Sequence, residues 1–438
     1  MKRISARLSW ALPINLFACL LLTAALPGVA QGRNDHDRNK DYQHLGAYFE
    51  EWSIYGANYF LADTENSGAA AKLTHLLYAF ANVTTGGQCL LADPWADYGD
   101  PYLPSVINGQ TNPGPLYGNF YNLTQLKQLH PQLKVLISLG GASQMNTLGF
   151  QVSASTPALR QSLAASCINL FINGNIANGV TAPGLFDGID LDWEFPTATD
   201  KTNFTALVQE FRRQLDALGL QNNTHYLLTI AAPAGEQNFS NIELAKVAKQ
   251  LDFLNMETYD YHGTWETTTN HAAPLFDSPF DPDRGQNFNI EYTIRSYLEA
   301  GVPGSKMLLG IPFYGRGWAG VPSINNGLYQ SSTGPAPSPQ GDSLQTPGVA
   351  TYRSLSALLG YGLNFDPFSL AEWLYSPTDN RGTFWTYENP QTIQVKMTYV
   401  KLRVRDGLGG GFLWALKDDD ANATLVKTMA DSLDIGDH

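Results

Sequence analysis

The 438-residue sequence predicts an α/β fold, a (β/α)8 barrel with a small α+β insertion between its seventh and eighth strands. Eight short apolar runs recur along the chain, and each is followed by a loop and a helix-like pattern, as in repeated βα units with a parallel sheet. Between the seventh and eighth runs the chain is far longer than one helix requires, which is typical of a functional loop or a small extra domain. In such a barrel, reactive side chains lie at the carboxyl ends of the strands.

The predicted barrel covers residues 44–434. Its strands, in order, are expected at 45–50, 73–82, 133–139, 186–194, 226–232, 253–261, 307–314 and 411–416. The insertion, at 319–383, opens with a Pro, Ser and Gly-rich stretch and then shows one helical run, 354–359, and two strand-like runs, 372–375 and 384–387. A second excursion, 86–123, is rich in Gly, Pro, Asn and Tyr, and we expect it to cover the same end of the barrel.

The N-terminus predicts export. Residues 1–30 resemble a signal peptide, with a basic start at Lys2, Arg3 and Arg7, an apolar stretch, and small residues before position 31. Residues 31–43 are polar and charged and are predicted to be a disordered start. No later stretch is long enough to cross a bilayer. We therefore expect a secreted protein, extracellular or periplasmic in a Gram-negative host, without membrane attachment after cleavage, and a monomer.

The composition excludes several classes of partner. The chain holds 40 acidic and 27 basic residues, for a net charge of −13, and the leader contributes only basic ones. An acidic surface repels nucleic acid and anionic membranes, so a neutral or cationic partner is expected. There is no His/Cys cluster with metal-ligand spacing and no Gly-rich phosphate loop. We therefore predict neither a metal nor a cofactor.

Two cysteines, Cys89 and Cys167, follow the leader. Export would permit a disulfide between them. Cys167 also lies in an apolar helical run, where a buried free thiol is equally compatible with the pattern. Pairing cannot be deduced from the sequence, so both alternatives stay open.

The fourth predicted strand carries the strongest indication of chemistry. Residues 187–196, Asp-Gly-Ile-Asp-Leu-Asp-Trp-Glu-Phe-Pro, place Asp190, Asp192 and Glu194 at alternate positions. Alternate side chains of a strand share one face, about 7 Å apart per step. Like charges at that spacing raise at least one pKa, which keeps an acid protonated near neutrality. A calcium loop or a solvated acidic edge is disfavoured because large apolar residues alternate with the carboxylates.

This pattern resembles the Asp-x-x-Asp-x-Asp-x-Glu signature of the family-18 glycoside hydrolases, the chitinases. Further segments agree with that family in order, and together the resemblance covers roughly residues 44–430. They are Tyr48-Phe49 with Trp52, Tyr78-Ala79-Phe80-Ala81-Asn82, Ser138-Leu139-Gly140-Gly141, Tyr259-Asp260-Tyr261-His262-Gly263 with Trp265, Tyr314-Gly315-Arg316-Gly317-Trp318, and Gly409-Gly410-Gly411 before Trp414. The resemblance implies a bacterial-type chitinase domain whose insertion forms one wall of a cleft.

The resemblance also implies catalytic roles. It makes Glu194 the acid that protonates the glycosidic oxygen, and then the base that activates water. It makes Asp192 the partner of the substrate acetamido N–H, with Asp190 sharing a proton with Asp192, and Tyr259 the partner of the acetamido oxygen. The acetamido group itself would act as nucleophile. Asp187 has the opposite strand parity and is expected to be structural.

The substrate-binding residues that the resemblance implies are Tyr48, Trp52, Ser138, Asp260, Trp265, Arg316 and Trp414. Aromatic rings stack on sugar faces, so Trp414 would form the floor of the site, with Trp52 and Trp265 extending it on opposite sides. Arg316 would neutralise some of the charge of the carboxylate cluster, contact the sugar, or form an ordinary ion pair. The implied substrates are chitin and chito-oligosaccharides, cut internally with retention of configuration.

Two positions depart from the family pattern. Glu257 stands two residues before Tyr259, where chitinases usually carry Met, and its parity directs a fourth carboxylate into the barrel. It is expected either to pair with Arg316 or another base, or to titrate anomalously. Ala142 stands where many relatives carry Trp on the leaving-group side, so weaker binding is expected there.

Two other functions are compatible with the same fold. A chitin-binding lectin would normally have lost the acid, whereas Glu194 is present. An endoglycosidase acting on the chitobiose core of N-glycans shares the carboxylate motif but normally lacks the insertion and the terminal Trp. The sequence therefore favours hydrolysis of chitin.

Overall fold

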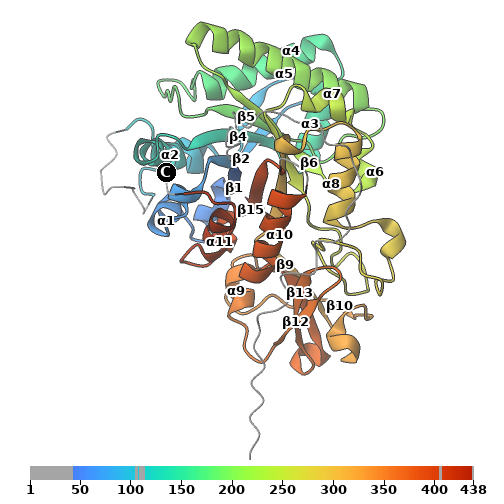
Figure 1. Ribbon diagram of the computed structural model, residues 1–438. Helices are drawn as coiled ribbons and strands as arrows, with labels where there is room; N and C mark the ends of the chain where they lie inside the picture. The colour runs from blue at the N-terminus through green and yellow to red at the C-terminus, as the bar shows by residue number, and fades with distance from the viewer. Residues whose placement is uncertain (1–42, 104–106, 108–113, 404–406, 437–438) are drawn as a thin grey trace, which may run out of the picture. The chain divides into compact units, whose positions relative to one another are not determined.

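A computed structural model describes residues 43–103, 107, 114–403 and 407–436. The predicted signal peptide and all but the last residue of the predicted disordered start lie outside these ranges. Eight strands form the barrel (Figure 1). They are β1 (His44–Glu50), β2 (His75–Val83), β4 (Lys134–Gly140), β5 (Gly188–Asp192), β6 (Leu227–Pro233), β7 (Phe253–Glu257), β8 (Met307–Pro312) and β15 (Gly410–Trp414).

Hydrogen bonding closes these strands into a ring. The order is β1-β15-β8-β7-β6-β5-β4-β2, β2 pairs with β1, and every pairing is parallel. The short strand β3 (Cys89–Leu91) adds to β2 in antiparallel fashion. The predicted (β/α)8 barrel is therefore confirmed. Parallel closure brings the carboxyl ends of all eight strands to one end of the ring, where a site can be built from several of them.

Two strands end earlier than the sequence pattern predicted. β5 ends at Asp192 and β7 at Glu257, so Glu194 and Tyr259 each lie two residues beyond a strand. The ladder stops there because the backbone turns away from its neighbours. The side-chain alternation nevertheless carries Glu194 to the same side as Asp192.

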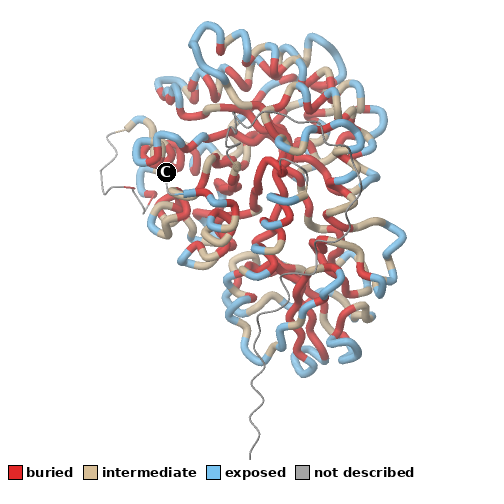
Figure 2. Tube along the Cα trace, viewed as in Figure 1, coloured by how far each residue is buried: buried red, intermediate tan, exposed pale blue. Residues whose placement is uncertain are grey.

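Helices follow the strands and surround the barrel (Figure 1). The long helix α5 buries Phe204, Leu207, Val208, Phe211 and Leu215, the stripe of an amphipathic helix packed against a sheet. The helices are α1 (Leu61–Asn66), α2 (Gly118–Leu129), α3 (Gln144–Ala154), α4 (Pro157–Cys167), α5 (Lys201–Asn222), α6 (Glu236–Phe239), α7 (Leu244–Ala248), α8 (Ile290–Glu299), α9 (Tyr352–Ser356), α10 (Pro390–Leu402) and α11 (Thr424–Ser432). In Figure 2 the strands are mostly buried, whereas the outer turns of the helices are exposed.

A second, antiparallel sheet interrupts the seventh βα unit. Its order is β10-β9-β14-β13-β12, and β11 also pairs with β9. Its strands are β9 (Tyr314–Ala319), β10 (Gly334–Pro335), β11 (Val349–Thr351), β12 (Gly362–Asp366), β13 (Ala371–Ser376) and β14 (Thr383–Tyr387). The two strands expected within the insertion correspond to β13 and β14. The exact boundaries of 319–383 stay a prediction.

Two further expectations concern covalent and membrane structure. Cys89 of β3 and Cys167 at the end of α4 form a disulfide, with their Cα atoms 5.0 Å apart. Of the two alternatives that the sequence left open, the structure has the disulfide. Among the described residues, no helix has both the length and the apolar character needed to cross a membrane.

Candidate active site

A cavity of about 760 Å³ opens at the carboxyl ends of the barrel strands. Glu50, Asp192, Glu257 and Trp414, each the last residue of a barrel strand, line it. Most of the residues predicted for the site also line it. They are Tyr48, Asp192, Glu194, Tyr259, Asp260, Trp265, Arg316 and Trp414. Asp190, Ser138 and Trp52 are not among the lining residues. Asp190 accepts a hydrogen bond from the lining residue Tyr48, Ser138 donates to Asp190, and Trp52 stacks on Phe80.

Asp190 lies beneath the cavity, fully buried, and accepts hydrogen bonds from four strands. Its donors are Tyr48 Oη at 2.9 Å, Ser138 Oγ at 2.7 Å, Thr229 Oγ1 at 2.5 Å and Asn255 Nδ2 at 3.2 Å. Burial raises the pKa of Asp190, and the four donors oppose that shift. These four donors are the hydrogen-bond partners of Asp190 among the described residues, and proton sharing between Asp190 and Asp192 stays a prediction.

Asp192 and Glu194 enter the cavity because Trp193, the residue between them, faces outward. The Trp193 ring stacks on Phe150 of α3, with ring centroids 5.4 Å apart, and also contacts Phe204 of α5. This anchor fixes the alternation and sends the two flanking carboxylates inward. Thr147 Oγ1 holds the backbone of Glu194 by donating to its carbonyl oxygen at 3.0 Å.

Gly140 allows the neighbouring backbone to approach this segment. It has a φ of +118°, and a Cβ atom there would collide with the carbonyl oxygen of Asp192. The next residue, Gly141, donates its N–H to that same oxygen at 2.9 Å. Only glycine combines this conformation with this closeness, so the Gly140-Gly141 pair positions Asp192.

The carboxylates at the cavity are strongly perturbed. Burial raises the pKa of Asp192 well above its usual value, and the charges of Glu194, Glu257 and Asp190 add to the effect. Burial, reinforced by the charge of Asp260, raises the pKa of Glu194 to about 7. A carboxyl with that pKa is substantially protonated near neutrality, as a general acid must be.

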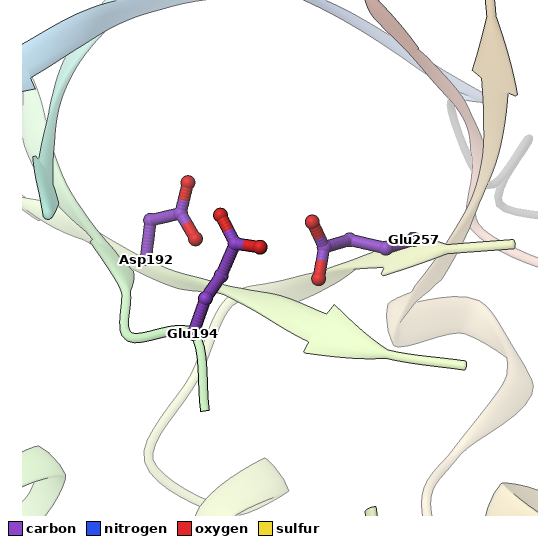
Figure 3. Close-up of side chains that lie close together, drawn as sticks. All are labelled: Asp192, Glu194 and Glu257. Atoms are coloured by element: carbon purple, nitrogen blue, oxygen red, sulfur yellow. The ribbon is translucent and has the colours of Figure 1, made fainter. Parts of the chain in front are cut away.

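Glu257 also faces these carboxylates. One oxygen each of Asp192, Glu194 and Glu257 lies within 4.8 Å of the others. In Figure 3 the Glu194 carboxyl lies between the other two. Burial, followed by the charges of Glu194, Asp260 and Asp190, raises the pKa of Glu257 well above its usual value. The structure therefore favours anomalous titration of Glu257 over pairing with a base.

Arg316 binds Asp260. Its Nε donates to Oδ1 of Asp260 at 2.8 Å, and its Nη2 donates to Oδ2. Tyr314 Oη also donates to Oδ2, at 2.9 Å. The guanidinium lies 5.3 Å from the ring centroid of Trp265, a cation–π contact. Of the expectations for Arg316, the ion pair is present, and a contact with the sugar stays a prediction. Burial raises the pKa of the Tyr259 phenol in the same cavity well above its usual value, so this phenol remains a neutral donor.

Aromatic rings form a row that reaches the cavity at Trp414. Trp52 stacks on Phe80 with centroids 5.9 Å apart, and Phe80 stacks on Trp414 at 5.8 Å. The Tyr48 ring contacts Trp414 at the end of the row, with ring centroids 5.0 Å apart. Trp52 is 38% exposed and Trp265 is 59% exposed. Such exposed aromatic faces are free to stack on sugar rings.

Sequence reasoning missed part of the site. Lys417 Nζ lies 2.7 Å from Oε2 of Glu50 and 3.0 Å from Oδ1 of Asp418, and all three residues line the cavity. Burial raises the pKa of Glu50 to about 7 against the opposing effect of Lys417. Thr229 and Asn255 were also missed, although a polar residue inside an otherwise apolar strand is a usable indication of a buried polar contact.

The group formed by Asp192, Glu194 and Glu257 is the one set of three metal-type ligands found in the described part of the chain. Because the pKa of each is raised, protons compete with a metal ion for these oxygens. We assign no metal to the group, and the geometry provides acid–base chemistry without one.

Comparison with known proteins agrees with this geometry. Residues 44–419 match the model of the glycosyl hydrolases family 18. Chitinase A1 of Niallia circulans is 32% identical over 95% of this chain and 62% of its own length. Chitinase C of Streptomyces lividans is 34% identical over 86% of this chain and 57% of its own length. The chain thus spans about 60% of the length of these two relatives.

A solved structure is similar in three dimensions. The catalytic domain of a psychrophilic chitinase B from Arthrobacter TAD20 superposes with a TM-score of 0.81 at 33% identity, covering 90% of this chain and 95% of that one. The family match extends from β1 to the loop after β15 and includes every residue that lines the cavity. The chain belongs to family 18 of the glycosyl hydrolases.

Proposed function

We propose that this protein is a chitinase that hydrolyses internal β-1,4 bonds between N-acetylglucosamine units with retention of configuration. The observation that carries the proposal is Glu194, a cavity carboxyl with a pKa raised to about 7, beside the buried Asp192. Membership of family 18 and the chitinases among its relatives support the same substrate class.

In the proposed mechanism, Glu194 donates its proton to the glycosidic oxygen as the bond to C1 breaks. The acetamido oxygen of the same sugar attacks C1 and forms an oxazolinium ion. Asp192 accepts a hydrogen bond from the acetamido nitrogen and stabilises the positive charge, while the Tyr259 phenol donates to the acetamido oxygen. Water then gives a proton to Glu194 and attacks C1, which opens the oxazolinium ring. This step restores the acid, and the product retains the configuration.

The cavity walls support a polymeric substrate. Trp414 offers a stacking surface in the cavity, the partly exposed Trp52 offers one farther along the same aromatic row, and Trp265 offers one beside Arg316. Ala142 lines the cavity without an aromatic ring, so the leaving-group side binds more weakly than a Trp-bearing site. This combination favours internal cutting of a chain that is held mainly on one side of the bond.

We further propose that the protein acts outside the cytoplasm as a monomer. The support is the leader-like composition of residues 1–30 and the disulfide between Cys89 and Cys167, because disulfides persist in oxidising compartments. The net charge of −13 disfavours nucleic acid as a partner and is compatible with a neutral polysaccharide.

A time course of the products from chitin hexamer, with anomers resolved, tests the proposed activity. Retention with internal cutting predicts that dimer, trimer and tetramer appear first, with new reducing ends initially in the β configuration. Initial α anomers would contradict retention, and release of monomer alone would contradict internal cutting. Cellohexaose is the matched control, because it lacks the acetamido nucleophile and should stay intact.

A further inference from the structure

Four donors engage both oxygens of Asp190. Oδ1 of Asp192 is buried and has no hydrogen-bond partner among the described residues, and Asp192 as a whole is only 3% exposed. Buried polar atoms in native proteins are almost always paired, so we expect a donor for Asp192 close by.

Glu257 approaches from β7, and its Oε2 is likewise buried and has no hydrogen-bond partner in the described part of the chain. The Asp192, Glu194 and Glu257 carboxyls have one oxygen each within 4.8 Å of the others (Figure 3). Two unpaired carboxyl oxygens repel each other when both groups are ionised. They become complementary when one group carries a proton, because a protonated carboxyl is a donor.

No base in the described part of the chain neutralises this set. Arg316 is bound to Asp260, and Lys417 is bound to Glu50 and Asp418. Some titratable groups shift the pKa of Glu257 by their charge, and others have their own pKa shifted by the charge of Glu257. All of these groups are acidic. They are Asp190, Asp192, Glu194, Asp260, Tyr48, Tyr259, Tyr297 and Tyr314. The four phenols stay neutral because burial raises their pKa values, so only protons can relieve the carboxyl set.

We propose that Glu257 carries a proton in the working enzyme and that its O–H donates to Glu194, whose carboxyl has an oxygen within 4.8 Å of it, as a positioning residue for the catalytic acid. This role rests on the proposed function. When Glu194 gives its proton to the leaving oxygen, the O–H of Glu257 stabilises the new carboxylate. Glu194 then recovers a proton from the attacking water, and the proton of Glu257 is not consumed.

Two substitutions separate this role from the alternatives. Glu257→Gln keeps a neutral donor of the same shape, and Glu257→Met keeps the volume but removes the donor. If Glu257 is a protonated donor, the apparent pKa of the alkaline limb of kcat/KM should stay within a few tenths of a unit of the wild-type value in the Gln variant. The Met variant should move that limb upward by about one unit and lower kcat by about tenfold, because the carboxylate form of Glu194 loses a hydrogen bond.

The opposite results overturn the proposal. An ionised Glu257 would raise the pKa of Glu194, so both variants would then move the alkaline limb downward. Two unchanged profiles would mean that Glu257 does not act on Glu194. Glu299→Gln, which alters an exposed carboxyl outside the cavity, is the matched control for neutralising a glutamate.

A measurement without turnover keeps the test independent of the activity. The infrared difference spectrum between the wild type and Glu257→Gln at neutral pH should show loss of a protonated carboxyl band. Loss of a carboxylate band instead would overturn the proposal even if the Met variant failed to fold. If the wild type does not cleave chitin hexamer, the proposed function fails, and the infrared result still decides the protonation of Glu257.

Discussion

Arg316 and Asp260 form a two-point ion pair at the edge of the cavity, with Nε of Arg316 2.8 Å from Oδ1 of Asp260 and Nη2 bound to Oδ2. Asp260 is also the charge that, after burial, contributes to raising the pKa of Glu194. The pair therefore links the substrate-binding wall to the acid. Arg316 moderates the influence of Asp260 on Glu194 without contacting Glu194 itself.

We predict from this link that Asp260→Asn moves the alkaline limb of kcat/KM to lower pH by roughly half a unit to one unit, because a nearby negative charge is removed. Titration of kcat/KM with a soluble chito-oligosaccharide measures it. Arg316→Lys keeps the positive charge but loses the two-point geometry, so it should raise KM and leave the limb nearly in place. A downward shift in Arg316→Lys equal to that of Asp260→Asn would contradict this assignment.

The wild-type pH profile has a defined direction. Glu194 must be protonated to act as the acid, and burial raises its pKa to about 7. Activity should therefore decline as the pH rises through about 7. The decline should be spread over more than one unit, because the coupled carboxyls titrate as a set. A kcat/KM that stays constant up to pH 9 would contradict the role of Glu194.

The donors to Asp190 should contribute to stability. Thr229 Oγ1 donates to a fully buried carboxylate, so Thr229→Val leaves an acceptor short of a partner. We expect a loss of about 1–3 kcal/mol in the free energy of unfolding, measured by urea denaturation. Thr398→Val, at an exposed helix position, is the matched control. Equal effects of the two substitutions would rule out a special contribution from Thr229.

Glu51 and Asp97 form another buried pair of acids, from which we predict a loss of stability at alkaline pH. Glu51 is 4% exposed, and burial, followed by the charge and hydrogen bond of Asp97, raises its pKa to about 10. A folded-state pKa above the unfolded value means that its contribution to stability is complete at low pH. That contribution is lost as the pH rises from the unfolded value towards about 10.

Glu51→Gln removes this titration. The variant should match the wild type in unfolding free energy near pH 4 and become more stable than the wild type by pH 9. Urea denaturation at the two pH values measures the difference, with the exposed Glu299→Gln as control. The reverse order at pH 9 would show that Glu51 is ionised in the folded protein.

The parity of the strands explains how much of the site could be predicted. Period-two alternation placed Asp190, Asp192 and Glu194 on one side and directed Glu257 inward, and the structure agrees for all four. Alternation also survives past the end of β5, because Trp193 is anchored in the helix layer.

Pairing between elements could not be predicted in the same way. Arg316 binds Asp260 rather than Glu257, and Lys417 bridges Glu50 and Asp418. These choices depend on distances of a few ångströms between elements far apart in the chain. The sequence shows which side chains face the cavity, but not which of them touch.

Glu194→Gln is the substitution that tests the central claim most directly, since the amide keeps the shape of the acid but has no proton to donate to the leaving oxygen. The measurement is kcat on chitin hexamer, together with the Kd for the hexamer from calorimetry. We predict that Kd stays within a few-fold of the wild-type value while kcat falls by about 10²–10⁴-fold, the usual contribution of general acid–base catalysis. A fall in kcat of less than about tenfold, with Kd unchanged, would contradict the assignment of Glu194 as the acid.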